Sequence, residues 1–238
     1  MLIQALCDYY DILAQNGEIV PENYSRVNVN YLICLLDDGR VDKIIDISVK
    51  GENKGKKAPK ETVMPKRTEK PGIDANFIEH RATYIFGLNM VEGKLIPDDR
   101  TDKARKSHKK FVETNLDFIE GIDSPVVNAY RNFIKTWVPE NETENENLLS
   151  EGKEYGKYGY VFCLSGDPDK YLNNDPEIMK RWDELSEKLK AKEAENAYIA
   201  QCAIEGDYKP ISQIHSKIKG VSGSLATGTV PSPPLLTI

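Results

Sequence analysis

The stretch VNVNYLICLLDDGRVDKIIDISV, residues 27–49, decides the fold that this sequence predicts. Residues 27–36 and 41–49 are rich in Val, Ile and Leu, and β-branched residues favour strands. Asp-Asp-Gly at 37–39 separates the two runs, and short turns that contain glycine join antiparallel strands. We therefore expect an antiparallel β-hairpin over this stretch.

Helical spacing of apolar residues and additional strand-like runs surround the hairpin. Ser124-Pro125 and Asp175-Pro176 are typical of helix starts, where a capping side chain precedes a proline. Apolar residues recur at helical spacing in four segments, at 2–13, 104–119, 126–137 and 178–189. Two further strands are expected at 158–164 and 197–204. Helices combined with antiparallel strands predict an α+β fold.

The composition indicates an intracellular globular protein. The chain has 238 residues, 39% of them hydrophobic, and a formal net charge of −6. It contains no run of about 18 apolar residues, so we expect no membrane span. Its first residues lack the features of a secretory signal. The four cysteines are widely spaced without a CxxC pair, which suits a reducing cytoplasm.

A basic segment follows the hairpin. Between Lys50 and Gly72, eight cations oppose three anions, which gives this segment a net charge of +5. Glycines and prolines are scattered through residues 50–71, so we expect a long loop, and long loops in compact domains are commonly functional or disordered. Lysines on such a loop could follow a phosphate backbone, although a solvated surface loop explains the charge equally well. Non-specific DNA contacts are predicted at Lys54, Lys56, Lys57 and Lys60.

Two other charged segments stand out. Residues 103–110 form a second basic cluster, and residues 138–155 are rich in Asn and Glu. The acidic segment fits a solvated connector, or a surface of a protein-interaction module that docks a basic partner.

Known catalytic motifs are missing from the sequence, so we expect no enzyme activity and no cofactor. It lacks GxGxxG, GxxxxGK[ST], HExxH and GxSxG. A metal-dependent nuclease is the alternative, with Asp167, Asp169 and Asp175 as cation ligands. A polar turn followed by a helix cap explains these residues better. A zinc site could be formed by Cys163, Cys202 and His215, but their spacing is not that of known zinc ligands.

Three groups of residues resemble one protein family in order along the chain. The opening MLIQALCDYYDILAQNGEIVPENYSRVNVNYLICLLDDGRV, the P-x-R, G-I, N-F and Y-x-x-G-L pattern within 63–88, and the C-x-x-x-G turn with IHSKIKGV within 202–221 carry the likeness. They resemble the large subunit of the type I-C CRISPR effector complex, Cascade (Csd family). The chain departs from the family at Glu79-His80-Arg81, where the family has Asp-Asn.

The resemblance implies a binding function in antiviral defence. The large subunit reads a short motif that flanks the target on duplex DNA and helps to open the strands, while the guide RNA reads the sequence by pairing. The implied partners are double-stranded target DNA, guide RNA, the backbone and guide-handle-binding subunits of Cascade, and a helicase-nuclease that is recruited later. The family is longer than this chain. The resemblance therefore implies an N-terminal α+β domain at 1–195, the start of the next segment at 196–221, and a truncated, loosely ordered tail at 222–238.

Within this family reading, the flanking motif would be read near the end of the basic segment. The amide of Asn76 offers a donor and an acceptor to a base edge, or alternatively caps the segment that starts at Phe77. Gly72 would let the backbone approach a groove closely. Phosphates beside the motif would be held by Lys66, Arg67 and Lys70.

Overall fold

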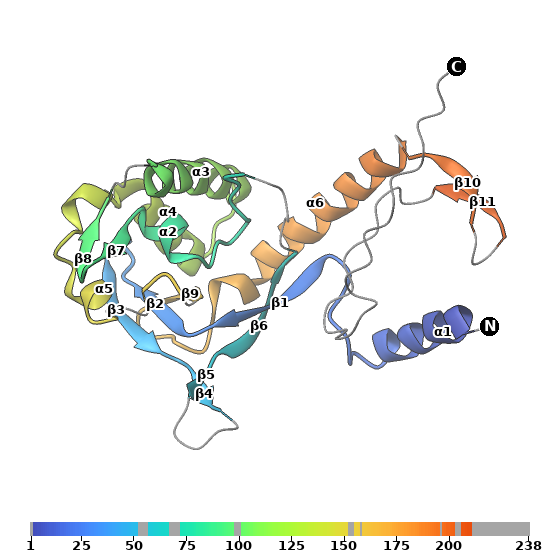
Figure 1. Cartoon of the computed structure of the whole chain (residues 1–238), viewed down its shortest axis with the longest axis horizontal. Coiled ribbons are helices and arrows are strands. Elements are labelled where there is room, and N and C mark those ends of the chain that lie inside the picture. The colour runs from blue at the N-terminus through green and yellow to red at the C-terminus, as the bar shows by residue number, and fades with distance from the viewer. Residues whose placement is uncertain are drawn as a thin grey trace. The chain divides into compact units, whose positions relative to one another are not determined.

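The computed structural model describes residues 2–51, 57–66, 72–97, 101–151, 155–157, 159–195, 197–202 and 206–210. It confirms the α+β prediction, because helices pack against mainly antiparallel sheets (Figure 1). The chain divides into two compact units, Met1–Lys190 and Ala191–Ile238. The predicted tail at 222–238 lies outside the described residues, and the boundary after residue 195 stays a prediction.

The first unit is built on a three-stranded sheet with the order β3-β2-β9. β2 (Tyr31–Leu35) pairs antiparallel with β3 (Val41–Asp46), which confirms the predicted hairpin within residues 31–46, whereas residues 27–29 pair with residues 60–62 instead. β9 (Tyr160–Leu164) pairs with β2 in parallel. At Asn30 the backbone bonds to Gly159 and Ile47, and this residue separates β2 from β1 (Tyr24–Val29).

Two of the three strands, β2 and β9, are buried on both faces, whereas β3 is only partly buried. Ile33, Leu35 and Phe162 face the helical core, whereas Cys34 and Cys163 belong to a second buried cluster on the other face. This double burial explains the nearly unbroken apolar run of β2, because a strand covered on both sides has no need of polar alternation. The two thiols face each other with their Sγ atoms 3.4 Å apart, and both are free.

The prediction of a loop throughout 50–71 is wrong for much of the described part. β4 (Val49–Lys50) pairs with β5 (Lys57–Ala58), and β6 (Lys60–Pro65) pairs antiparallel with β1 over its whole length. β6 forms because Thr62 and Met64 alternate with exposed residues and pack inward. Its proline, Pro65, stands at the strand end, where it removes no essential ladder bond.

Three helices cover one face of the sheet: α2 (Ala82–Phe86), α3 (Lys103–Phe118) and α4 (Pro125–Thr136). Ser124 caps α4 as expected, since its hydroxyl accepts a hydrogen bond from the Val127 N–H. The largest side chains of this core, all nearly inaccessible to solvent, are Phe86, Phe111, Tyr130, Phe133, Tyr160 and Phe162.

The other elements complete the two units. The first unit contains α1 (Leu2–Gln15), β7 (Asn89–Val91), β8 (Lys94–Ile96), η1 (Pro139–Asn141), α5 (Glu146–Leu149) and η3 (Leu172–Asn174). α6 (Pro176–Glu195) starts in the first unit, and β10 (Ile199–Gln201) pairs with β11 (Tyr208–Pro210) in the second. Among the described residues, none of the helices combines the length and apolar character needed to cross a bilayer.

Candidate nucleic-acid interface

The described lysines of the basic segment lie along β4, β5 and β6. Lys50 ends β4, Lys57 starts β5, Lys60 starts β6 and Lys66 follows β6. All four side chains are exposed. We call this set the β4–β6 basic surface. The other predicted cations of the segment, Lys54, Lys56, Arg67 and Lys70, lie outside the described residues.

Two of these four lysines are engaged by the protein itself. Lys57 Nζ lies 2.5 Å from Asp46 Oδ2 at the end of β3. Burial pushes the pKa of Asp46 upward, but hydrogen bonds from Lys57 and Ser48 outweigh burial and leave it below its ordinary value. Lys60 Nζ donates to the Tyr171 hydroxyl at 2.9 Å and lies 5.0 Å from the centre of that ring. These contacts fix the two ammonium groups on the surface.

Lys50 and Lys66 are different. Neither of them has an ion pair with another residue in the described part of the chain. An exposed ammonium without an anionic neighbour keeps its full charge for an external anion. These two lysines are therefore the members of the β4–β6 basic surface that are best prepared to contact a phosphate.

A cavity of about 650 Å³ adjoins this surface. Arg26 and Lys60 supply its positive charge, while Glu61 and Asp169 supply negative charge. Arg26 Nη1 is 3.1 Å from Glu61 Oε2, so much of this charge is already balanced. The mixed lining does not favour an anion over a cation.

The residues predicted to read the flanking motif lie in contrasting places. Gly72 is exposed, with a φ of 98° and open space where a Cβ would stand, so its backbone is accessible. Asn76 is only 5% exposed, and its side-chain amide donates to Glu79 Oε2 at 3.3 Å. A base edge cannot reach a buried amide, so this arrangement weighs against Asn76 as the reader, and that role stays a prediction.

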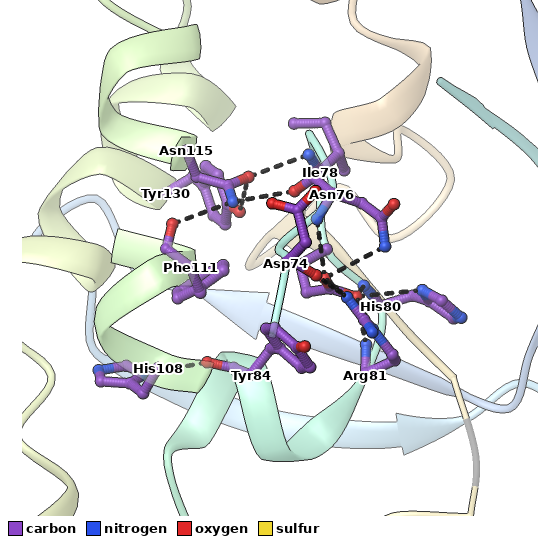
Figure 2. Close-up of polar contacts among 11 residues, drawn as sticks. Asp74, Asn76, Ile78, His80, Arg81, Tyr84, His108, Phe111, Asn115 and Tyr130 are labelled. Carbon is purple, nitrogen blue, oxygen red and sulfur yellow. Dashed lines mark hydrogen bonds and ion pairs between the residues drawn. The ribbon is translucent and has the colours of Figure 1, made fainter. Parts of the chain in front are cut away.

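Asn76 belongs instead to a polar network centred on Glu79. Figure 2 labels Asn76, His80 and Arg81, which contact this carboxylate. The Glu79 carboxylate is completely buried and accepts hydrogen bonds from the backbone N–H groups of Asn76, His80 and Arg81. The Arg81 guanidinium donates two further hydrogen bonds to this carboxylate, from Nε to Oε1 at 2.9 Å and from Nη2 to Oε2 at 2.6 Å. Burial alone would lower the pKa of Arg81, but the adjacent carboxylate raises it.

Asn115 on α3 binds the backbone of the same segment, residues 76–81, from the helical side. Its amide donates to the carbonyl oxygens of Asn76 and Phe111, and its Oδ1 accepts from the Ile78 N–H and the Tyr130 hydroxyl (Figure 2). Ile78 has a φ of 52°, which is unfavourable for a β-branched residue and needs such support. The side chains of Glu79 and Asn115 bind backbone groups of residues 76–81 and hold this segment in its conformation, so the network has a structural role. The sequence around Asn76 does not predict this network, because Asn115 lies 39 residues further along the chain.

The alternative metal and zinc sites find no support in the described residues. Asp175 caps α6 by accepting from the Glu177 N–H at 3.0 Å, and Asp167 pairs with Lys170 at 2.8 Å. The described part of the chain contains no cluster of His, Cys, Asp and Glu suited to a metal ion. His215 lies outside the described residues.

Comparison with protein families identifies a family whose model covers most of the chain. The model of a family described as CRISPR-associated protein (Cas_Csd1) matches residues 6–230. A comparison with curated proteins found no match.

Proposed function

Since this chain belongs to the CRISPR-associated protein Cas_Csd1 family, we propose that it acts as the DNA-binding large subunit, or its N-terminal part, in a type I-C RNA-guided surveillance complex. It would recognise the motif that flanks the target and assist strand opening, by binding and without catalysis. The observation that carries this proposal is the exposed β4–β6 basic surface, where Lys50 and Lys66 have no anionic partner among the described residues.

This surface supports duplex binding through phosphate contacts. Lysine contacts to phosphates position a protein on DNA, whereas the base edges supply sequence information. Gly72 follows the surface with an exposed backbone, and backbone groups can approach a groove where a side chain would block them. In the proposed complex the partners are double-stranded target DNA, guide RNA, the other Cascade subunits and a later helicase-nuclease. The proposed location is the cytoplasm, where the target DNA and the guide RNA are accessible.

The test is duplex binding by a double charge reversal, Lys50→Glu with Lys66→Glu. If both lysines neutralise phosphates, the slope of log affinity against log salt falls by about 2, and affinity at about 50 mM salt falls at least ~10-fold. The matched control is Lys180→Glu with Lys188→Glu, which makes the same charge change on exposed positions of α6. An unchanged slope and affinity in the first variant would contradict the proposal. Permuting the flanking sequence in the assembled complex then tests motif recognition.

A further inference from the structure

A second basic surface lies on α3. Five of the first eight residues of this helix are cations, and we call them the α3 basic face: Lys103, Arg105, Lys106, Lys109 and Lys110. The opposite side of α3 packs into the core through Ala104, His108 and Phe111. Within the first unit, Figure 1 shows α3 and the β4–β5 hairpin at opposite ends. The α3 basic face is therefore a separate surface.

The order of charges along α3 opposes helix stability. Its first turn contains no acidic residue and its last turn no basic one. The acidic residues follow the cations, at Glu113 and Asp117. The start of a helix is the positive end of its dipole, so cations there are unfavourable, and like charges three or four residues apart repel each other. A face that serves only solubility has no reason to adopt this order.

Only the beginning of the α3 basic face is neutralised. Arg105 lies 3.7 Å from Asp102 Oδ1 and 3.7 Å from Glu140 Oε1. In contrast, Lys106, Lys109 and Lys110 have no ion pair within the described residues, and Lys106 and Lys109 are exposed. These three ammonium groups create a local positive field on a chain whose net charge is negative.

The composition of this face distinguishes between two kinds of anionic partner. Protein interfaces are depleted in lysine and enriched in aromatic residues. The exposed residues of α3 are charged, and this helix exposes no aromatic side chain. A face without stacking groups cannot bind splayed bases, but lysines without apolar neighbours are suited to phosphates. Residues 103–110 span about 10 Å of helix axis, which corresponds to about three phosphates along one strand.

We propose that the α3 basic face is a second nucleic-acid contact, which binds a phosphate backbone independently of base sequence. This proposal rests on the proposed function, because it adds a second nucleic-acid-binding surface to the same protein. With surfaces at two ends of one unit, the protein holds two nucleic-acid segments at once. The segment on α3 can be duplex or single-stranded, since the chemistry of recognition is the phosphate itself.

The experiment uses the full chain with Lys106→Glu and Lys109→Glu, measured against labelled duplex and single-stranded DNA of random sequence between about 50 and 200 mM salt. We expect the salt slope to fall by about 2 on the strand type that α3 holds, with affinity at least ~10-fold lower at the low-salt end. Thermal unfolding gives an independent readout. Glutamates near the start of a helix suit its dipole, so the same variant should unfold at the same or a higher temperature.

The controls separate this proposal from the previous one. The α6 variant, Lys180→Glu with Lys188→Glu, should bind like the wild type, and an equal loss in this variant would mean a general charge effect and overturn the α3 proposal. Binding that survives reversal on α3 but not at Lys50 and Lys66 overturns the α3 proposal alone, and the converse overturns the proposed function alone. A wild-type chain that binds no DNA overturns both. If polyglutamate of equal charge competes as well as DNA, the partner is an acidic protein and the α3 proposal fails.

Discussion

Arg81 is the charge partner of a carboxylate that has no access to water. Glu79 is completely buried, while the Arg81 side chain is partly exposed and also stacks 3.7 Å from the centre of the Tyr84 ring. Removing one member of a buried pair leaves an uncompensated charge. We expect Arg81→Ala to lower the free energy of unfolding by about 2–4 kcal/mol, measured by urea denaturation. Adding Glu79→Gln should recover part of this loss. A single variant as stable as the wild type would show that the pair contributes little.

Asn76 provides a test of the base-reading role at the same scale. Its amide holds Glu79, so Asn76→Ala should cost about 1–2 kcal/mol of stability through the lost hydrogen bond. Because the side chain is buried, complexes assembled from the folded variant should keep the flanking-motif preference of the wild type. The two readouts are thermal unfolding and binding to duplexes with permuted flanks. Lost preference with unchanged stability would restore Asn76 as the reader.

At the scale of elements, Gly39 lies in the turn of the central hairpin, which packs closely against the backbone of α4. It has a φ of 89°, and a Cβ at this position would lie 2.2 Å from the backbone nitrogen of Phe133. Neither the turn nor the helix backbone can move without disturbing the core. We therefore expect Gly39→Ala to lower the free energy of unfolding by at least ~3 kcal/mol, judged by the urea midpoint. Gly72→Ala is the matched control, since that φ is also positive but the space around it is open, and its loss should be smaller. Equal losses in the two variants would show that backbone strain dominates.

The elements that the sequence predicts well are those whose signals are local. The hairpin of β2 and β3 has both strands and its turn within 31–46, and the caps of α4 and α6 lie beside the helices that they start. β6 was missed because its partner β1 is remote and glycines and prolines surround it. The burial of Asn76 depends on Asn115, which α3 supplies from 39 residues away. Periodicity within one segment holds no information about such a partner.

At the scale of the whole molecule, Glu151 makes stability depend on pH. Burial raises the pKa of Glu151 to about 7, although a hydrogen bond from the Tyr160 hydroxyl lowers it in part. The folded state therefore keeps a proton that the unfolded state loses near the ordinary pKa of 4.5. Stability should fall as pH rises from about 4.5 to 7, because the unfolded state then binds fewer protons. Allowing for partial exposure, we expect a change of about 1–2 kcal/mol.

The check on this dependence is Glu151→Gln, which imitates the protonated side chain. Urea denaturation at pH 5 and pH 8 should show a smaller difference for this variant than for the wild type, with the variant the more stable of the two at pH 8. If both proteins lose the same stability over this range, the dependence arises from other groups.

The buried thiols of Cys34 and Cys163 allow local opening of the sheet to be measured by chemical modification. Both sulfur atoms lie side by side on β2 and β9, in the buried cluster on one face of the sheet, whereas Cys7 on α1 is exposed. Burial raises the pKa of Cys163, and a protonated thiol is a poor nucleophile. An alkylating reagent should modify Cys7 promptly and reach the sheet pair only when the buried cluster that covers this face of the sheet opens. Mass spectrometry of the alkylated chain would thus measure how fast this buried region opens, with Cys7 as the internal reference. The measurement can be made on the protein alone or bound to its partners.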